Sequence, residues 1–116
     1  MEKDILGTIT RILIEYGKQK QLITYSELSN LVNKKLNKKV VLPVNIHKYL
    51  HDICENSYKE KGFMLGALVI SKKLKMPSNG FFKFAEKILN KRFSSHDDKK
   101  NFWINELKKI YQEFDS

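Results

Sequence analysis

The sequence predicts a mainly α-helical domain with a short two-stranded sheet. Apolar residues recur at helical spacing in five segments, and two short apolar runs, at 21–24 and 63–71, are the strand candidates. The chain of 116 residues is 41% hydrophobic, which suffices for one globular domain with a packed core. A single cysteine, Cys54, and an N-terminus without a secretory leader predict a reduced, cytoplasmic setting. No apolar run approaches the roughly 18 residues of a membrane span, so no membrane is expected.

The first helix is predicted over residues 2–17, and Gly17 stands where a helix C-cap belongs. A short strand follows at 21–24. Thr24 and Glu27 have the spacing of a capping box, in which the side chain of each accepts a hydrogen bond from the backbone N–H of the other, so a second helix is expected to start here. The apolar stripe of this second helix is formed by Tyr25, Leu28, Leu31, Val32 and Leu36.

A polar, basic connection ends at Pro43, a residue that suits the first turn of the next helix. That third helix is expected to end at Gly62. The segment 63–71 is apolar on both alternating faces and contains the β-branched Val69 and Ile70, which favours a covered strand over a buried helix with the same pattern. The third helix carries the apolar residues Ile46, Tyr49, Leu50 and Ile53.

Turn residues separate this strand from the C-terminal helices. Pro77 and Asn79–Gly80 predict a turn, followed by a helix over 80–92. Phe81 and Phe82 are adjacent, so a straight helix start cannot direct both into one core. Either both rings pack through a bend, or one stays exposed to stack on bases or to meet a protein partner.

Ser95 and Asp98 form a variant capping box, which predicts the start of the last helix. The apolar stripe of this helix is either part of the core or a face for a homodimer or another protein partner. If it were uncovered in the monomer, it would form a patch that solubility disfavours. The stripe consists of Trp103, Leu107, Ile110, Tyr111 and Phe114.

The predicted order of elements is helix, strand, two helices, strand and two helices. Two short strands that flank a helix pair are the layout of a winged helix-turn-helix. In that layout the run at 21–24 pairs with the end of the segment 63–71, and the turn-rich residues that follow form the wing.

The charge is segregated along the chain. The net charge is +9, of which residues 18–95 contribute +11 and each end contributes −1. Such segregation indicates a surface for a polyanion, although a Lys-rich composition alone produces the same excess. Apart from Arg11 and Arg92 every basic residue is Lys, which attracts phosphate but does not make the bidentate base contacts of Arg.

The second and third helices form a candidate helix-turn-helix, in which the second helix of the pair enters the major groove of DNA. The linker is longer than the roughly three or four residues of the compact motif, so a generic helical hairpin is an equal alternative. The side chains expected to reach base edges are Asn45, His47, Lys48 and His51.

Two clusters are candidates for phosphate contacts. One follows the second helix, where the helix dipole alone also favours cations. The other follows the strand directly, in the position of a wing. The first cluster consists of Lys34, Lys35, Lys38 and Lys39, and the second of Lys72, Lys73, Lys75 and Asn79.

Few residues have the patterns of catalytic sites. His47 and His51 are spaced i, i+4, but no third ligand follows at the spacing of a zinc site. Cys54 lies on an apolar stripe, as a small core residue would, and its i, i+3 spacing from His51 is a weak sign of a nucleophilic pair. No Gly-rich phosphate loop and no G-x-S-x-G motif is present. We therefore expect a protein that is not an enzyme and that needs no metal or other cofactor.

The run LITYSELSNLV, followed by the third helix and an apolar segment, resembles the DNA-binding domain of alkylguanine-DNA alkyltransferases and alkyltransferase-like proteins. The similarity covers residues 20–72 and implies a winged helix-turn-helix fold and DNA binding. The Pro-Cys-His-Arg active site of that family is absent, since Cys54 stands in DICEN, so alkyl transfer is not implied. The residues that carry the resemblance are Thr24, Tyr25, Glu27 and Leu28.

The sequence thus predicts a non-catalytic winged-helix protein that binds nucleic acid, with duplex DNA favoured over RNA. Residues 1–75 would form the winged-helix-like core and residues 76–116 a helical extension. The alternative is a protein-interaction or regulatory subunit, in a phage, mobile-element or defence context, that binds a protein partner through exposed aromatic side chains.

Overall fold

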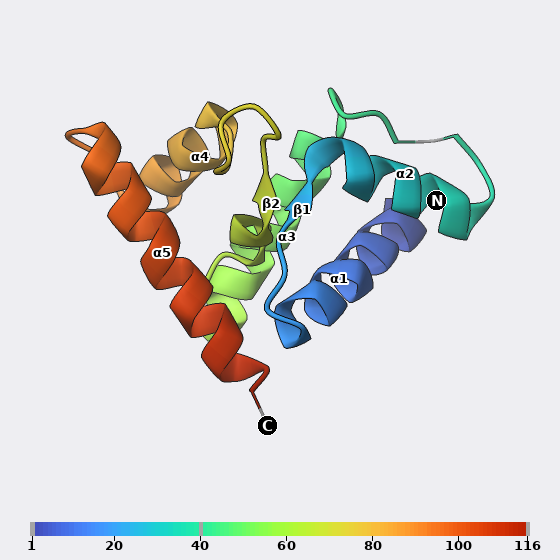
Figure 1. The fold of residues 1–116 in the computed structure, drawn as a ribbon, viewed down its shortest axis with the longest axis horizontal. Helices are drawn as coiled ribbons and strands as arrows, with labels where there is room; N and C mark the ends of the chain where they lie inside the picture. The colour runs from blue at the N-terminus through green and yellow to red at the C-terminus, as the bar shows by residue number, and fades with distance from the viewer. Residues whose placement is uncertain (1, 40, 116) are drawn as a thin grey trace.

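Five α-helices surround a small sheet and one 3-10 helix, as Figure 1 shows for the computed structural model, which describes residues 2–39 and 41–115. This arrangement confirms the predicted fold class, mainly α with a short two-stranded sheet. In chain order the elements are α1 (Glu2–Lys18), β1 (Ile23–Thr24), α2 (Tyr25–Leu36), α3 (Ile46–Lys61), η1 (Leu65–Leu68), β2 (Val69–Ile70), α4 (Asn79–Leu89) and α5 (His96–Glu113).

The two strands pair in parallel, with Ile23 opposite Val69 and Thr24 opposite Ile70. The predicted pairing of the two apolar runs is therefore confirmed, although each strand is only two residues long. Because parallel strands need a crossover connection, the chain passes through α2 and α3 between them. In the described part of the chain no third strand joins this sheet, so the residues after β2 do not form a hairpin.

The prediction of one continuous strand over 63–71 is wrong for most of that segment. Leu65–Leu68 form the 3-10 helix η1, and only the next two residues belong to a strand. Residues 63–69 are all buried, and α1, α3 and α5 pack around η1. Strand β1 pairs only with Val69 and Ile70, at the end of this segment. The backbone N–H and C=O groups of residues 63–68 therefore need hydrogen-bond partners other than a neighbouring strand.

Helix α3 supplies some of these partners through one serine. Ser57 Oγ accepts a hydrogen bond from the N–H of Leu65 at 2.9 Å. The same hydroxyl donates to the carbonyl of Phe63 at 2.7 Å. One side chain therefore satisfies two backbone groups at the entrance to η1.

Helix α5 supplies further hydrogen-bond partners for this buried backbone. Glu106 is 2% exposed, and its Oε1 accepts from the N–H of Met64 at 2.9 Å. Its second oxygen pairs with Lys109 Nζ at 3.0 Å, which offsets the cost of burying the carboxylate. Trp103 Nε1 donates to the carbonyl of Ala67 at 2.8 Å. These contacts hold α5 against the buried segment.

Gly17 does not form a C-cap, contrary to the prediction. Helix α1 continues through Lys18, and the residue with left-handed backbone is Lys20, at φ 55°. A Cβ atom at Gly17 would lie 2.9 Å from Cδ2 of Phe114. The glycine is therefore needed for space, because it allows the end of α5 to pack against α1.

The C-terminal helices are largely as predicted. Phe81 and Phe82 are both buried, edge to face with ring centroids 5.2 Å apart, so the alternative in which both pack is the correct one. Ser95 Oγ accepts from the N–H of Asp98 at 3.1 Å, which confirms the cap of α5. The carboxylate of Asp98 accepts in turn from the N–H of Ser94, one residue before the expected position.

The apolar stripe of α5 is covered within the monomer. Trp103 and Ile110 are buried, and the other three members are partly buried against the core. Of the two alternatives for this stripe, the structure supports the core. The three partly buried members are Leu107, Tyr111 and Phe114.

The close approach of η1 to α3 can be tested at Gly66. A Cβ atom here would lie 2.5 Å from Sγ of Cys54, so Gly66→Ala should destabilise the fold by about 1–3 kcal/mol through overpacking. In a Cys54→Ala background the sulfur is gone, and the same substitution should cost less by at least about 1 kcal/mol. Denaturant unfolding of the wild type, the two single variants and the double variant measures this coupling. An equal cost in both backgrounds would contradict the contact.

Candidate nucleic-acid interface

Helix α2 begins where predicted, at a complete capping box. Thr24 Oγ1 accepts from the N–H of Glu27 at 3.1 Å, and Glu27 Oε1 accepts from the N–H of Thr24 at 3.0 Å. The hydrogen bonds with Thr24 lower the pKa of the Glu27 carboxyl, and the charge of Lys72 lowers it further. Lys72 therefore lies near the start of α2, although it follows β2 in the sequence.

The connection between α2 and α3 ends in a fixed turn. Asn33 of α2 holds Val41 by two hydrogen bonds, from the Val41 N–H to Asn33 Oδ1 at 2.8 Å and from Asn33 Nδ2 to the Val41 carbonyl at 2.7 Å. Asn45 Oδ1 accepts from the N–H of Leu42 at 2.8 Å. Helix α3 starts directly after Asn45, so Pro43 lies in this turn. The expectation that Pro43 would lie in the first turn of the helix is therefore wrong.

Three segments meet at the upper edge of the molecule in Figure 1: the start of α2, the first turn of α3 and the turn after β2. The Tyr25 hydroxyl accepts from the N–H of Ser78 at 3.0 Å and donates to Ser78 Oγ at 3.2 Å. The Tyr25 ring also packs against His47 of α3, with ring centroids 4.7 Å apart. We call this region the lysine edge, after its exposed basic residues Lys48, Lys72, Lys73 and Lys75.

The turn after β2 is closed by its own backbone. The N–H of Ser71 donates to the carbonyl of Met76 at 2.9 Å, and the N–H of Lys75 donates to the carbonyl of Ser71 at 2.8 Å. Met76 is buried, and Lys75 has left-handed backbone at φ 61°. The segment predicted as a wing is thus a compact turn that exposes its lysines and buries Met76. Its exposed predicted residues are Lys72, Lys73 and Lys75. Asn79, which was expected in the same turn, is instead the first residue of α4, where it is exposed.

The other predicted lysine cluster lies apart from this edge. It is at and beyond the C-terminal end of α2, whereas the lysine edge adjoins the start of that helix. A helix of 12 residues is about 18 Å long, which separates the two surfaces. We call this second surface the α2 cluster. Its members, all exposed, are Lys34, Lys35, Lys38 and Lys39.

The two histidines expected to reach base edges point inwards instead. His51 stacks on Phe84 of α4, with ring centroids 4.4 Å apart and planes 8° from parallel. Its Nε2 is buried and has no hydrogen-bond partner within the described residues. Burial lowers the pKa of both His47 and His51, so both rings are neutral at pH 7. They belong to the contacts of α3 with α2 and α4.

The outward face of α3 has mixed charge. After Lys48 it presents Asp52, Asn56, Lys59 and Glu60, all of them exposed. Carboxylates on a helix in the major groove would be repelled by the flanking phosphates. On this face the side chains that precede the first carboxylate are those at the start of α3, the N-cap Asn45 and Lys48 in the first turn.

Acidic residues are absent from the chain segments that supply both lysine surfaces. Residues 28–51 and 61–85 each contain five lysines and neither Asp nor Glu. Within the described ranges, no ion pair includes a lysine of either surface. The four ion pairs found there are Lys18–Glu15, Lys59–Glu55, Lys61–Glu113 and Lys109–Glu106.

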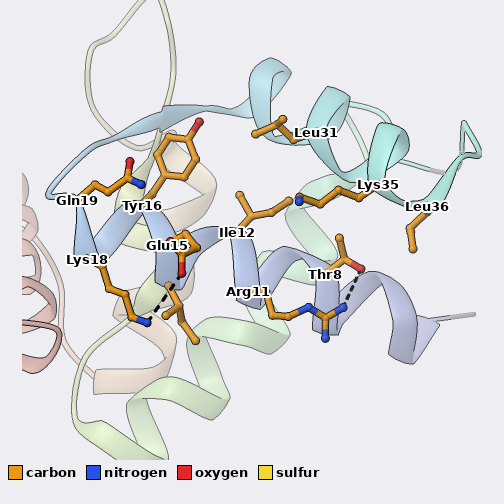
Figure 2. Close-up of a pocket in the computed structure, with 11 residues that line it drawn as sticks. Thr8, Arg11, Ile12, Glu15, Tyr16, Lys18, Gln19, Leu31, Lys35 and Leu36 are labelled. Carbon is orange, nitrogen blue, oxygen red and sulfur yellow. Dashed lines mark hydrogen bonds and ion pairs between the residues drawn. The ribbon is translucent and has the colours of Figure 1, made fainter.

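A groove between α1 and α2 was not indicated by any sequence pattern. It has a volume of about 1040 Å³ and joins apolar side chains to exposed basic ones (Figure 2). Arg11 of α1 donates to Thr8 Oγ1 at 3.5 Å, and Lys35 extends from α2 towards Ile12. Only the packing of the two helices creates this groove, because Arg11 and Lys35 lie far apart in the sequence.

The described residues contain no group of three or more His, Cys, Asp or Glu side chains that could hold a metal ion. No helix in residues 2–39 or 41–115 is both long and apolar enough to cross a bilayer. In comparisons with known proteins, no family model, no curated protein and no solved structure matches this chain.

The inward position of His51 predicts a pH-dependent stability. Because burial lowers the pKa of His51 from 6.5, the unfolded chain takes up a proton first as the pH falls. Stability that is present above about pH 6.5 is therefore lost below it. The melting temperature should fall between about pH 7.5 and 5.5, and it should fall less for His51→Gln. The exposed His96→Gln serves as the control, and an equal fall in all three proteins would contradict the burial of His51.

Proposed function

We propose that this protein binds duplex DNA without catalysis, through the lysine edge and the α2 cluster. One observation carries the proposal. The lysines of both surfaces are exposed and take part in no ion pair within the described residues, and the segments that supply them contain no acidic side chain. Besides the hydrogen bonds with Thr24, the charge of the nearby Lys72 lowers the pKa of the Glu27 carboxyl, but Lys72 and Glu27 form no ion pair. Exposed cations outside ion pairs are the electrostatic footprint of a protein that meets a polyanion.

The expected mode is contact with phosphates and little reading of bases. Lysine attracts phosphate without fixed geometry, and the inward histidines and mixed charge of α3 leave few side chains for base edges. In this mode the first turn of α3 faces the duplex, and the compact turn after β2 takes the place of a wing. Affinity should therefore depend strongly on salt and weakly on sequence.

A duplex is favoured over single strands because single-strand binding relies on exposed aromatic rings for stacking. Phe81 and Phe82, which were the candidates for such rings, are buried. The alternative function, binding of a protein partner, would need these aromatics or the apolar stripe of α5 to be exposed. Both are covered within the monomer, so no observation supports this alternative.

Titration of a fluorescent random duplex at several salt concentrations tests the proposal. Each phosphate contact contributes a slope of about −0.9 to log K against log salt. Replacing Lys72, Lys73 and Lys75 with Gln should weaken binding on all sequences and flatten this slope, while the melting temperature stays close to that of the wild type.

The matched control is a triple variant with the same charge change elsewhere, Arg92→Gln, Lys100→Gln and Lys108→Gln. These side chains are exposed and lie outside both lysine surfaces. Equal weakening in the two triple variants would show that only bulk charge acts. Absence of duplex binding by the wild type at about 50 mM salt would reject DNA binding.

A further inference from the structure

The exposed apolar side chains of this protein are not scattered. Among the described residues, four large apolar side chains are exposed, and three of them lie in the turns that adjoin the two lysine surfaces. Val44 is 81% exposed and Leu42 43% exposed, both in the turn before α3, and Leu74 is 54% exposed in the turn after β2. The fourth, Ile104, is 36% exposed on α5. Apolar groups held in solvent beside lysines indicate a surface that is covered by a partner.

The turn that presents Leu42 and Val44 is held firmly. Its base is Val41, which is fully buried and bound to Asn33 by two hydrogen bonds. Its other end is closed by the Leu42 carbonyl, which accepts from the N–H of Asn45 at 3.1 Å and from the N–H of Ile46 at 3.0 Å. Such a turn loses little conformational freedom when it binds, so its apolar side chains are preorganised for a partner.

We propose that Leu42, Pro43 and Val44 form an apolar wedge that enters the minor groove and separates one base step, so that the bound duplex is bent. This inference rests on the proposed DNA binding. Proteins that bend DNA insert Leu, Ile or Pro side chains between base pairs, and the cost of unstacking is offset by contacts that the bend allows. Lys39 lies before this wedge and Lys48 after it, where they can meet the phosphates on either side.

A lipid surface is the competing partner, and the small size of the wedge argues against it. Leu42, Pro43 and Val44 together bring about ten side-chain carbons, fewer than one myristoyl chain, which itself gives only marginal attachment to a membrane. A wedge has to fill only one opened base step. The stretch over residues 28–51, which contains the turn, carries five lysines and no carboxylate, and this charge suits the narrow, negative minor groove.

The bend can be measured by energy transfer between dyes at the two ends of a duplex of about 25 base pairs. The wild type should bring the ends closer together. The variant Leu42→Ser with Val44→Ser should lose most of this bend, while its affinity stays within about threefold and its salt slope is unchanged, because the lysines remain. Ile104→Ser, the same kind of change on α5, should bend DNA like the wild type.

The outcomes separate this inference from the proposed function. A wild type that binds DNA without bending it, or a double variant that bends as well as the wild type, would overturn the wedge and leave DNA binding in place. A wild type that binds no duplex would reject both. If the double variant loses binding to phosphatidylglycerol vesicles while DNA bending persists, the turn belongs to a lipid surface and the wedge is wrong.

Discussion

The packing of this protein depends on a buried stretch of backbone that has no strand partner along most of its length. Residues 63–68 lie among α1, α3 and α5, and their polar groups are met by Ser57, Glu106 and Trp103. A buried backbone group without a hydrogen-bond partner costs about 1–3 kcal/mol. Neither α3, which carries Ser57, nor α5, which carries Glu106 and Trp103, can therefore move away without that loss of stability. The absence of a side chain at Gly66 allows α3 to come close enough for its serine to reach the segment.

This constraint also places the lysine edge. The chain leaves the buried segment through β2, which runs parallel to β1, and the turn that follows is therefore delivered beside the start of α2. The hydroxyl of Tyr25 then ties that turn through Ser78. The lysines of the turn thus lie on a support that is continuous with the core, and their position does not depend on a flexible loop.

The distribution of charge follows the same architecture. The Lys61–Glu113 ion pair joins the C-terminal ends of α3 and α5, and the Lys109–Glu106 pair lies within α5, where the buried segment is held. The lysine surfaces have no comparable partners within the described residues, and the fixed turn before α3 adds apolar side chains to them. The proposed binding and bending of DNA rest on this combination of exposed lysines and exposed apolar side chains.

The sequence by itself determined the features that depend on neighbours along the chain. The capping box of Thr24 and Glu27, the left-handed cap at Gly62 and the cap at Ser95 use hydrogen bonds between residues a few positions apart, and such bonds can be read from spacing. Only the tertiary structure decided that His51 faces Phe84, that 65–68 becomes a 3-10 helix and that the strands run parallel. These outcomes depend on which groups from distant parts of the sequence come close enough in space to pack against or hydrogen-bond a buried group. The local sequence pattern carries no information about those spatial distances.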